Sequence, residues 1–113
     1  MTIKWVKVDP LVLRGEPFCY GTRLTVRQLL ELRRDGNGIA QLLREQPSLR
    51  PVGIATAYVY ASEHRDLYKE FFEKSGALLG PGFTDQEAAL LPDELRVPGA
   101  VVAAPKASAR ARA

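Results

Sequence analysis

Apolar residues recur at helical spacing in three stretches of the chain, and this spacing predicts three helices. Stripes of the i, i+3, i+4 kind predict helices over 26–35 and 38–46. Pro47 stops the second helix, because proline has no N–H to donate and clashes with the preceding turn. Pro51 suits the first turn of a third helix, where that N–H is not needed, and the pattern extends this helix over 51–74.

Three short segments rich in β-branched and aromatic residues precede the helices. They predict strands over 3–8, 11–13 and 18–20, separated by turns that contain glycine and proline. Thr25 and Gln28 then have the spacing of a capping box, in which two side chains satisfy backbone N–H groups at a helix start. The chain is therefore expected to pass from a small sheet directly into the first helix.

The first half of the third predicted helix, VGIATAYVYA, is apolar on nearly every face. A helix of this kind is buried on all sides, and two short helices are scarcely enough to cover it. We therefore expect a second copy of the chain to cover it, in a homodimer or a higher homo-oligomer. The residues expected at this interface are Ile54, Tyr58, Tyr60, Leu67 and Phe71.

The pattern loosens after Gly76, which divides the chain into a domain over 1–76 and a flexible arm over 77–113. Within the arm, a second capping-box spacing predicts a short helix over 85–91. The last residues are Ala, Pro, Ser and basic residues, which bury too little apolar surface to offset the entropy of ordering. A disordered basic tail is expected there.

The predicted fold class is mainly α: a homeodomain-like trihelical helix-turn-helix unit with a short N-terminal β-hairpin and an extended third helix. In helix-turn-helix proteins the later helix enters the DNA major groove, and arginines around it contact phosphates and bases. A trihelical bundle that does not bind DNA fits the same pattern. The residues expected to contact DNA are Arg50, Thr56, Arg44, Arg33, Arg34 and Arg14.

Charge and composition narrow the function classes only partly. Sixteen Lys and Arg against thirteen Asp and Glu give a net charge of +3, too small to show a nucleic-acid partner. The charges fall in blocks, with a basic N-terminal body, an acidic stretch over 77–98 and a basic end, as in many interaction proteins; a solvated surface gives the same pattern. The single cysteine and the lack of a long apolar run predict a soluble, cytoplasmic protein without a membrane segment.

Residues that carry catalysis are scarce. His64 is the only histidine and lies in a charged stretch, while Cys19 lies between aromatic residues, where a thiol usually behaves as a small buried apolar group. No cluster has metal-ligand spacing, and no strand precedes the glycines at 36–38 to make a phosphate loop. We expect neither an enzyme nor a cofactor.

The stretch GEPFCYGTRLTV, with QLLREQPSL and IATAYVYA after it, resembles a known family. It is similar to the domain-of-unknown-function family 433, helix-turn-helix proteins grouped with VapB-type antitoxins. The resemblance covers about residues 10 to 62. The matching residues of the first motif are Gly15, Pro17, Gly21, Thr22, Arg23, Leu24 and Val26.

The resemblance implies an antitoxin-like DNA-binding regulator of a type II toxin–antitoxin system. A C-terminal arm would neutralise the toxin, often a PIN-type ribonuclease in such systems. The alternative is an oligomerisation or adaptor module that does not bind DNA. Arg23 either contacts a partner or ties the helix start to the strands, and we expect the second, with a buried guanidinium. The residues expected to bind a partner are Phe83, Leu90, Leu91, Leu95, Arg110 and Arg112.

Overall fold

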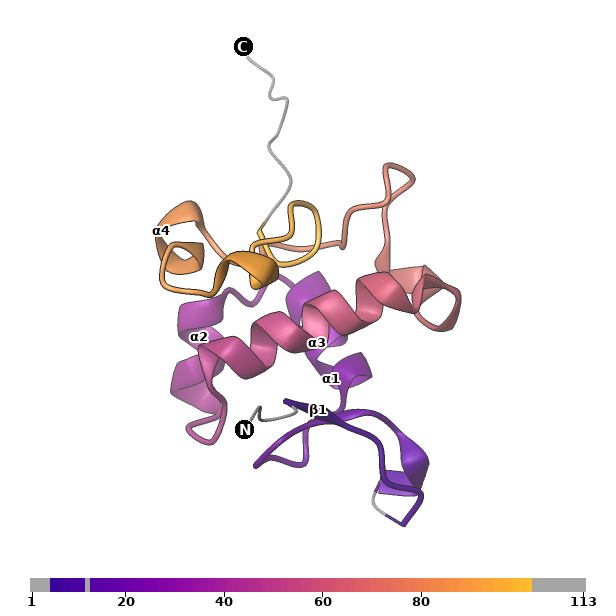
Figure 1. Ribbon diagram of the computed structural model, residues 1–113. Helices are drawn as coiled ribbons and strands as arrows, with labels where there is room; N and C mark the ends of the chain where they lie inside the picture. The colour runs from indigo at the N-terminus through magenta and orange to yellow at the C-terminus, as the bar shows by residue number, and fades with distance from the viewer. Residues whose placement is uncertain (1–4, 12, 103–113) are drawn as a thin grey trace.

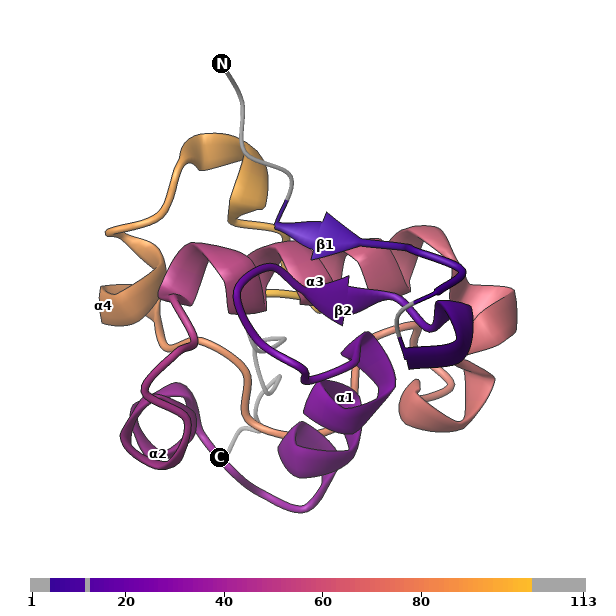
Figure 2. The ribbon, with the colours of Figure 1, turned by 90° about the horizontal axis from the view of Figure 1, so that it is seen from below.

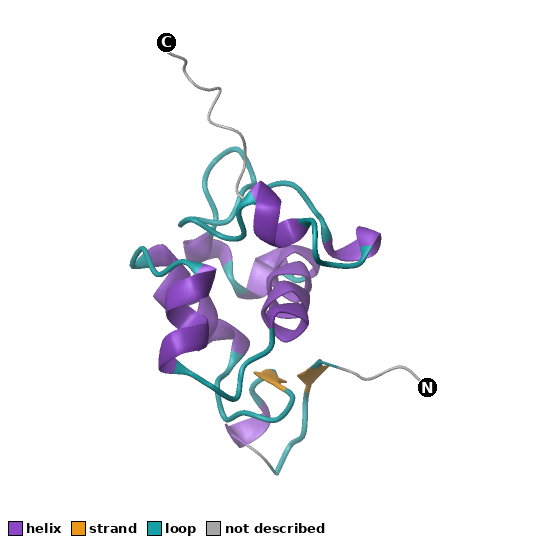
Figure 3. Cartoon of the chain, turned by 90° about the vertical axis from the view of Figure 1, so that its left-hand side faces the viewer, coloured by secondary structure: helices purple, strands orange, loops and turns teal. Residues whose placement is uncertain are grey.

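Helices pack around one central helix, and a small antiparallel hairpin lies at one end of the arrangement (Figure 1). The computed structural model describes residues 5–11 and 13–102. In Figure 3, where strands are orange, the hairpin lies on the opposite side of the molecule from the C-terminal loops. The prediction of a mainly helical fold with an N-terminal hairpin is confirmed.

The hairpin consists of two very short strands, β1 (Val6–Lys7) and β2 (Phe18–Cys19), which Figure 2 shows beside the central helix. They pair antiparallel, with Val6 opposite Cys19. The predicted strand over 11–13 is wrong: position 12 lies outside the described residues, and Leu13–Gly15 forms a 3₁₀ turn, η1. Leu13, Arg14 and Gly15 all have positive φ, which reverses the chain and excludes an extended conformation.

The first helix begins where the sequence predicts and ends one residue before its predicted limit. In α1 (Val26–Arg34) the Thr25 hydroxyl accepts the Gln28 N–H at 3.0 Å, and the Gln28 side chain accepts the Thr25 N–H at 2.9 Å. These two bonds satisfy backbone donors that the helix leaves free. Its apolar stripe is fully buried. The second helix, α2 (Ile39–Glu45), lies one residue inside each predicted bound.

The third helix is much shorter than predicted. The central helix α3 (Pro51–Glu63) ends eleven residues before the predicted end at Lys74, and two 3₁₀ turns follow, η2 (Arg65–Leu67) and η3 (Lys69–Phe71). These turns fold Tyr68 and Phe71 back into the core, where each is at most 2 % exposed. Burial of two aromatic rings is worth several kcal/mol, about 1.5–3 each, and it outweighs the local preference for helix.

The segment 77–102 is part of the same core, so the predicted flexible arm is wrong for these residues. The side chains of Leu78, Phe83, Leu91 and Val101 are buried with those of the helices. Backbone bonds hold the segment together, including Leu78 N–H to Gly99 O at 2.7 Å and Phe83 N–H to Val101 O at 2.8 Å. The predicted disordered tail lies outside the described residues.

A short helix, α4 (Asp85–Ala88), and a 3₁₀ turn, η4 (Asp93–Leu95), lie within this C-terminal segment. The predicted capping box is confirmed, because Thr84 and Glu87 exchange both of its hydrogen bonds. The helix ends three residues before its predicted limit.

The apolar start of α3 is covered by the chain itself. α3 packs against α1, both strands and η4, and the side chains of Ile54 and Tyr58 are completely buried. The inference that a second copy must cover this helix is therefore wrong. Residues 77–102, for which the sequence predicts a flexible arm, supply the missing cover.

Candidate protein-binding groove

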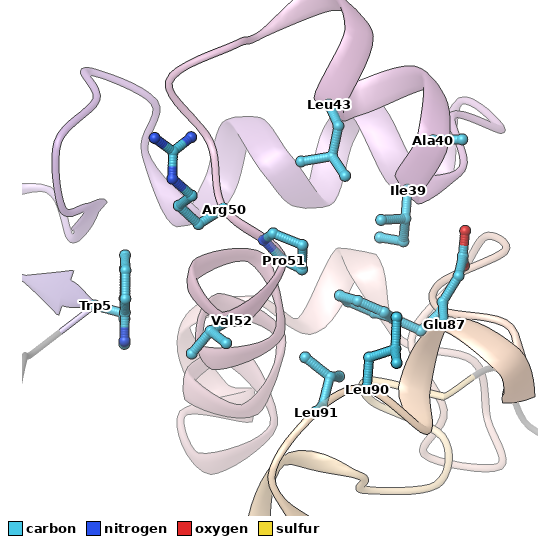
Figure 4. Close-up of a pocket in the computed structure, with 11 residues that line it drawn as sticks. Trp5, Ile39, Ala40, Leu43, Arg50, Pro51, Val52, Glu87, Leu90 and Leu91 are labelled. Carbon is cyan, nitrogen blue, oxygen red and sulfur yellow. The ribbon is translucent and has the colours of Figure 1, made fainter.

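An apolar groove of about 490 Å³ opens between α2, the first turn of α3 and α4. Figure 4 shows side chains from these elements facing one another across it, with Trp5 and Arg50 at one end and Glu87 at the other. Volumes of this size are typical of binding sites. The residues that line it are Trp5, Ile39, Ala40, Leu43, Arg50, Pro51, Val52, Phe83, Glu87, Leu90 and Leu91.

Local features of three helices position the walls. The apolar stripe of α2 turns Ile39 and Leu43 toward α3. Pro51 starts α3 and so fixes where Val52 enters the wall. The capping box of α4 fixes the turn that carries Leu91, which is buried.

Leu90 is the most unusual residue of the groove. Its side chain is 88 % exposed although it lies at the edge of an apolar surface. Burial of a leucine contributes about 1.5–3 kcal/mol, which the isolated chain does not gain here. Exposed apolar surface that adjoins a groove is typical of a site for another protein.

The end of the groove at Trp5 continues into a second hollow of about 300 Å³, which is lined by Trp5, Tyr20, Gly21, Ser48 and Arg50. The Trp5 ring packs against Gly53 of α3, where an added Cβ would lie 3.3 Å from the ring. Trp5 also meets Tyr20 edge to face, with ring centroids 6.1 Å apart. The indole is thus held as a fixed wall between the two hollows.

Arg50 supplies a cation at this end. Its Nη1 donates to the carbonyl oxygens of Pro47 and Leu49, both at 3.1 Å. Among the described residues no carboxylate forms an ion pair with it. At the opposite end, the Glu87 carboxylate accepts the Thr84 N–H through one oxygen only. The groove therefore carries a positive and a negative end.

Of the six residues predicted to contact DNA, Arg33 and Thr56 are not exposed. Arg33 is wrong as a DNA contact, because its side chain is 1 % exposed. Thr56 is half-buried, and its hydroxyl donates to Val52 O within α3 at 2.7 Å. The remaining four arginines are exposed: Arg14, Arg34, Arg44 and Arg50.

Arg33 instead lies inside the core without an acidic partner among the described residues. Its guanidinium lies 4.6 Å from the centre of the Tyr58 ring, and Nη1 donates to Ala100 O. Nε and Nη2 have no hydrogen-bond partner among the described atoms. Burial lowers the pKa of Arg33 and raises that of Tyr58. Arg33 therefore links α1 to the C-terminal segment.

Three residues predicted to bind a partner, Phe83, Leu90 and Leu91, line the groove. Leu95 is half-buried and lies outside its lining, while Arg110 and Arg112 lie outside the described residues. Trp5, Leu43 and Ile39 also line the groove, and the sequence does not predict this. They belong to a predicted strand and to a predicted helix stripe, and nothing in their spacing shows that they line a groove.

Three of the five predicted dimer-interface residues are buried in the core of the single chain. Ile54, Tyr58 and Phe71 are at most 2 % exposed within the single chain and cannot contact a second copy in this fold. Tyr60 is half-buried, and Leu67 is 51 % exposed.

Arg23 is exposed, so the expected buried guanidinium at this position is wrong. The neighbouring Thr22 holds the turn instead: its hydroxyl donates to Cys19 O at 3.0 Å and accepts the Leu24 N–H at 3.0 Å.

Cys19 and His64 are each constrained by their surroundings. Cys19 is 1 % exposed, and burial raises the pKa of its thiol to about 12, which disfavours the reactive thiolate. His64 stacks on Tyr60 and bonds to the Tyr60 carbonyl at 2.8 Å through Nδ1.

Across 5–11 and 13–102, no group of three or more potential ligands could hold a metal ion. In the same residues, no helix has the length and apolar character to cross a membrane.

The fold and the groove define a small, mainly helical domain with an apolar surface suited to binding. Residues 6–61 match the model of a family described as a protein of unknown function (DUF433), and the chain belongs to this family through that region. No curated protein and no solved structure gives a significant match. The family match ends before α4, so one wall of the groove lies outside it.

Proposed function

We propose that this protein is a cytoplasmic interaction module that docks another protein chain in the apolar groove. The observation that carries the proposal is the 88 % exposure of Leu90 beside an apolar hollow of about 490 Å³. An occupant that covers Leu90 and fills the hollow removes apolar surface from water on both sides, which is the main driving force for association. The role is that of an adaptor and needs no catalytic group.

The toxin-binding half of the antitoxin-like hypothesis is compatible with this module. The sequence predicts that Phe83, Leu90 and Leu91 bind a partner, and all three line the groove. A toxin would then be held by the folded surface of the domain rather than by a free arm. We therefore keep a toxin protein as one candidate partner.

Site-specific photo-crosslinking in cells tests the docking role. A benzophenone amino acid at Ala40, an exposed residue of the groove, should form a crosslink to a protein chain. The control position is Lys69, which is also exposed and lies in η3, beyond the other end of α3. Mass spectrometry of the crosslinked product identifies the partner. Equal crosslinking from both positions, or none from Ala40, would refute the proposal.

DNA binding is a second candidate function, favoured by one observation. Arg14, Arg34, Arg44 and Arg50 are exposed, and no carboxylate of the described residues forms an ion pair with them. Arginines that are free in this way can bind phosphates, and such binding weakens as salt rises. α3 is unsuited to contact bases in the major groove because most of its surface is buried. We therefore expect the arginines to contact the phosphates of the DNA backbone.

Titration with duplex DNA from the protein's own promoter region at several salt concentrations tests this candidate. Salt-sensitive binding should weaken in Arg34→Ala and in Arg44→Ala. The control is Arg27→Ala, because Arg27 is already paired with Glu70 at 2.7 Å. Binding that is absent at low salt, or that responds equally to all three variants, would exclude the DNA role.

A further inference from the structure

We infer that the occupant of the groove is a second copy of this chain, which is related to the first by a two-fold axis and inserts its Leu90. The inference rests on the proposed docking function and names the partner. It does not involve Ile54 or Tyr58 of α3, which are buried within each chain. In a two-fold pair each copy both supplies a leucine and receives one.

The first reason is that one face of the molecule carries both the projecting side chain and the hollow that fits it. Leu90 is 88 % exposed at the edge of the groove. The hollow is lined by aliphatic side chains of α2 and α3, including Ile39, Leu43 and Val52. Contacts between aliphatic groups need no directional match. When the two-fold axis passes between Leu90 and the hollow, Leu90 of each copy lies against the hollow of the other copy, so the surface is complementary to itself.

The second reason is the arrangement of charge. Arg50 lies at one end of the groove and Glu87 at the other (Figure 4). A two-fold axis across the groove exchanges its ends, so Arg50 of each copy faces Glu87 of the partner subunit. Both groups have bonding capacity left: Arg50 lacks a carboxylate among the described residues, and one oxygen of Glu87 has no hydrogen bond there. Opposite charges that meet in this way set the orientation of an interface.

The chain's own tail fits the groove less well than a second copy does. Residues 103–113 contain no large apolar side chain, and Lys106, Arg110 and Arg112 would bring positive charge toward Arg50. Like charges that are brought together weaken an association. The second copy offers an aliphatic side chain and a carboxylate only three residues apart, at Leu90 and Glu87.

Sedimentation equilibrium of the full chain over a wide concentration range tests the inference. The wild-type protein should show a monomer–dimer equilibrium. Leu90→Ser should raise the dimer dissociation constant by about 100-fold, since each of the two leucines contributes at least a factor of about 10. The matched control is Leu67→Ser, because Leu67 is half-exposed but does not line the groove, and this variant should dimerise like the wild type.

A charge exchange tests the orientation of the two copies. Arg50→Glu and Glu87→Lys should each weaken the dimer, because each single change places like charges face to face. The double variant restores opposite charges and should dimerise within about threefold of the wild type. Circular dichroism of each variant reports whether the fold is retained, and Glu87→Lys also removes one capping bond.

The outcomes separate this inference from the proposed function. A wild-type chain that stays monomeric at high concentration overturns the inference, as does a dimer that Leu90→Ser leaves intact. Failure of the double variant to recover overturns the two-fold orientation. If the monomeric protein still forms crosslinks from Ala40 to a different protein in cells, the docking function stands and only the identity of the partner is wrong.

Discussion

At the scale of single residues, burial determines what a side chain does, and burial cannot be predicted from the neighbouring residues in the sequence. Arg33 and Arg34 are adjacent arginines in the last turn of α1, yet Arg33 is 1 % exposed and Arg34 lies at the surface. The sequence predicts a DNA contact for both. The difference arises because residues 77–102 cover one side of α1 and leave the other to solvent.

Cys19 should make the stability of the protein depend on alkaline pH. The thiol has an ordinary pKa near 9.0, and burial raises it to about 12 in the folded chain. Between these values the unfolded chain loses the proton and the folded chain keeps it, so the free energy of unfolding falls as pH rises. Below about pH 9 both states are protonated and the thiol adds no pH dependence.

The measurement is urea denaturation of the wild type and of Cys19→Ala between pH 8 and 10.5. Other groups titrate in both proteins, so the difference between the two slopes isolates the thiol. The wild type should lose up to about 1.4 kcal/mol more per pH unit above pH 9. Equal slopes would mean that Cys19 is not buried as the structure describes.

At the scale of elements, the sequence predicts what is determined locally. Both capping boxes, at Thr25 and at Thr84, form as their spacing indicates, because the bonds join residues three apart. The end of α3 could not be predicted in this way. The chain leaves the helix at His64 so that Tyr68 and Phe71 can enter a core that more distant residues build.

Gly36 and Gly80 have similar backbone geometry but different surroundings, so substitutions at the two positions measure backbone strain and packing separately. Gly36 and Gly80 have φ of +99° and +97°, a conformation that side chains other than that of glycine rarely adopt. A Cβ at Gly36 meets nothing within 4 Å, whereas a Cβ at Gly80 overlaps the backbone of Arg33. Gly36→Ala should therefore cost about 1 kcal/mol, from the backbone alone.

Gly80→Ala should cost at least about 2 kcal/mol more than Gly36→Ala, because α1 and the C-terminal segment must separate to admit the methyl group. Chemical denaturation of the two variants and the wild type measures both values. A similar cost at the two positions would show that the chain around Gly80 does not approach Arg33 closely.

At the scale of the whole molecule, the candidate site emerges only when distant segments meet. The groove joins α2, the start of α3 and α4, and it also includes Trp5. The sequence predicts that Leu90 and Leu91 bind a partner, but it predicts them on a flexible arm. Their relation to Leu43 depends on how the C-terminal segment folds back, which no local pattern encodes.

Removal of the C-terminal segment should unfold the protein. A fragment over 1–76 lacks Leu78, Phe83, Leu91 and Val101, all of them core residues. Each contributes about 1.5–3 kcal/mol by burial, and together they rival the whole stability of a small domain. The control fragment over 1–102 keeps them all and should melt cooperatively.

Thermal melting followed by circular dichroism, with NMR spectra of both fragments, checks this outcome. If the fragment over 1–76 melts cooperatively at the temperature of the full chain, the prediction of a folded domain over 1–76 with a separate arm would be correct after all.

The placement of Trp5 has a practical consequence for the study of this protein. It is the only tryptophan of the chain, and it stands at the junction of both hollows. Its fluorescence emission is therefore a built-in optical signal for this one surface. Whatever displaces water from the indole shifts the emission to shorter wavelength, so a change there can be followed in unlabelled protein and in real time.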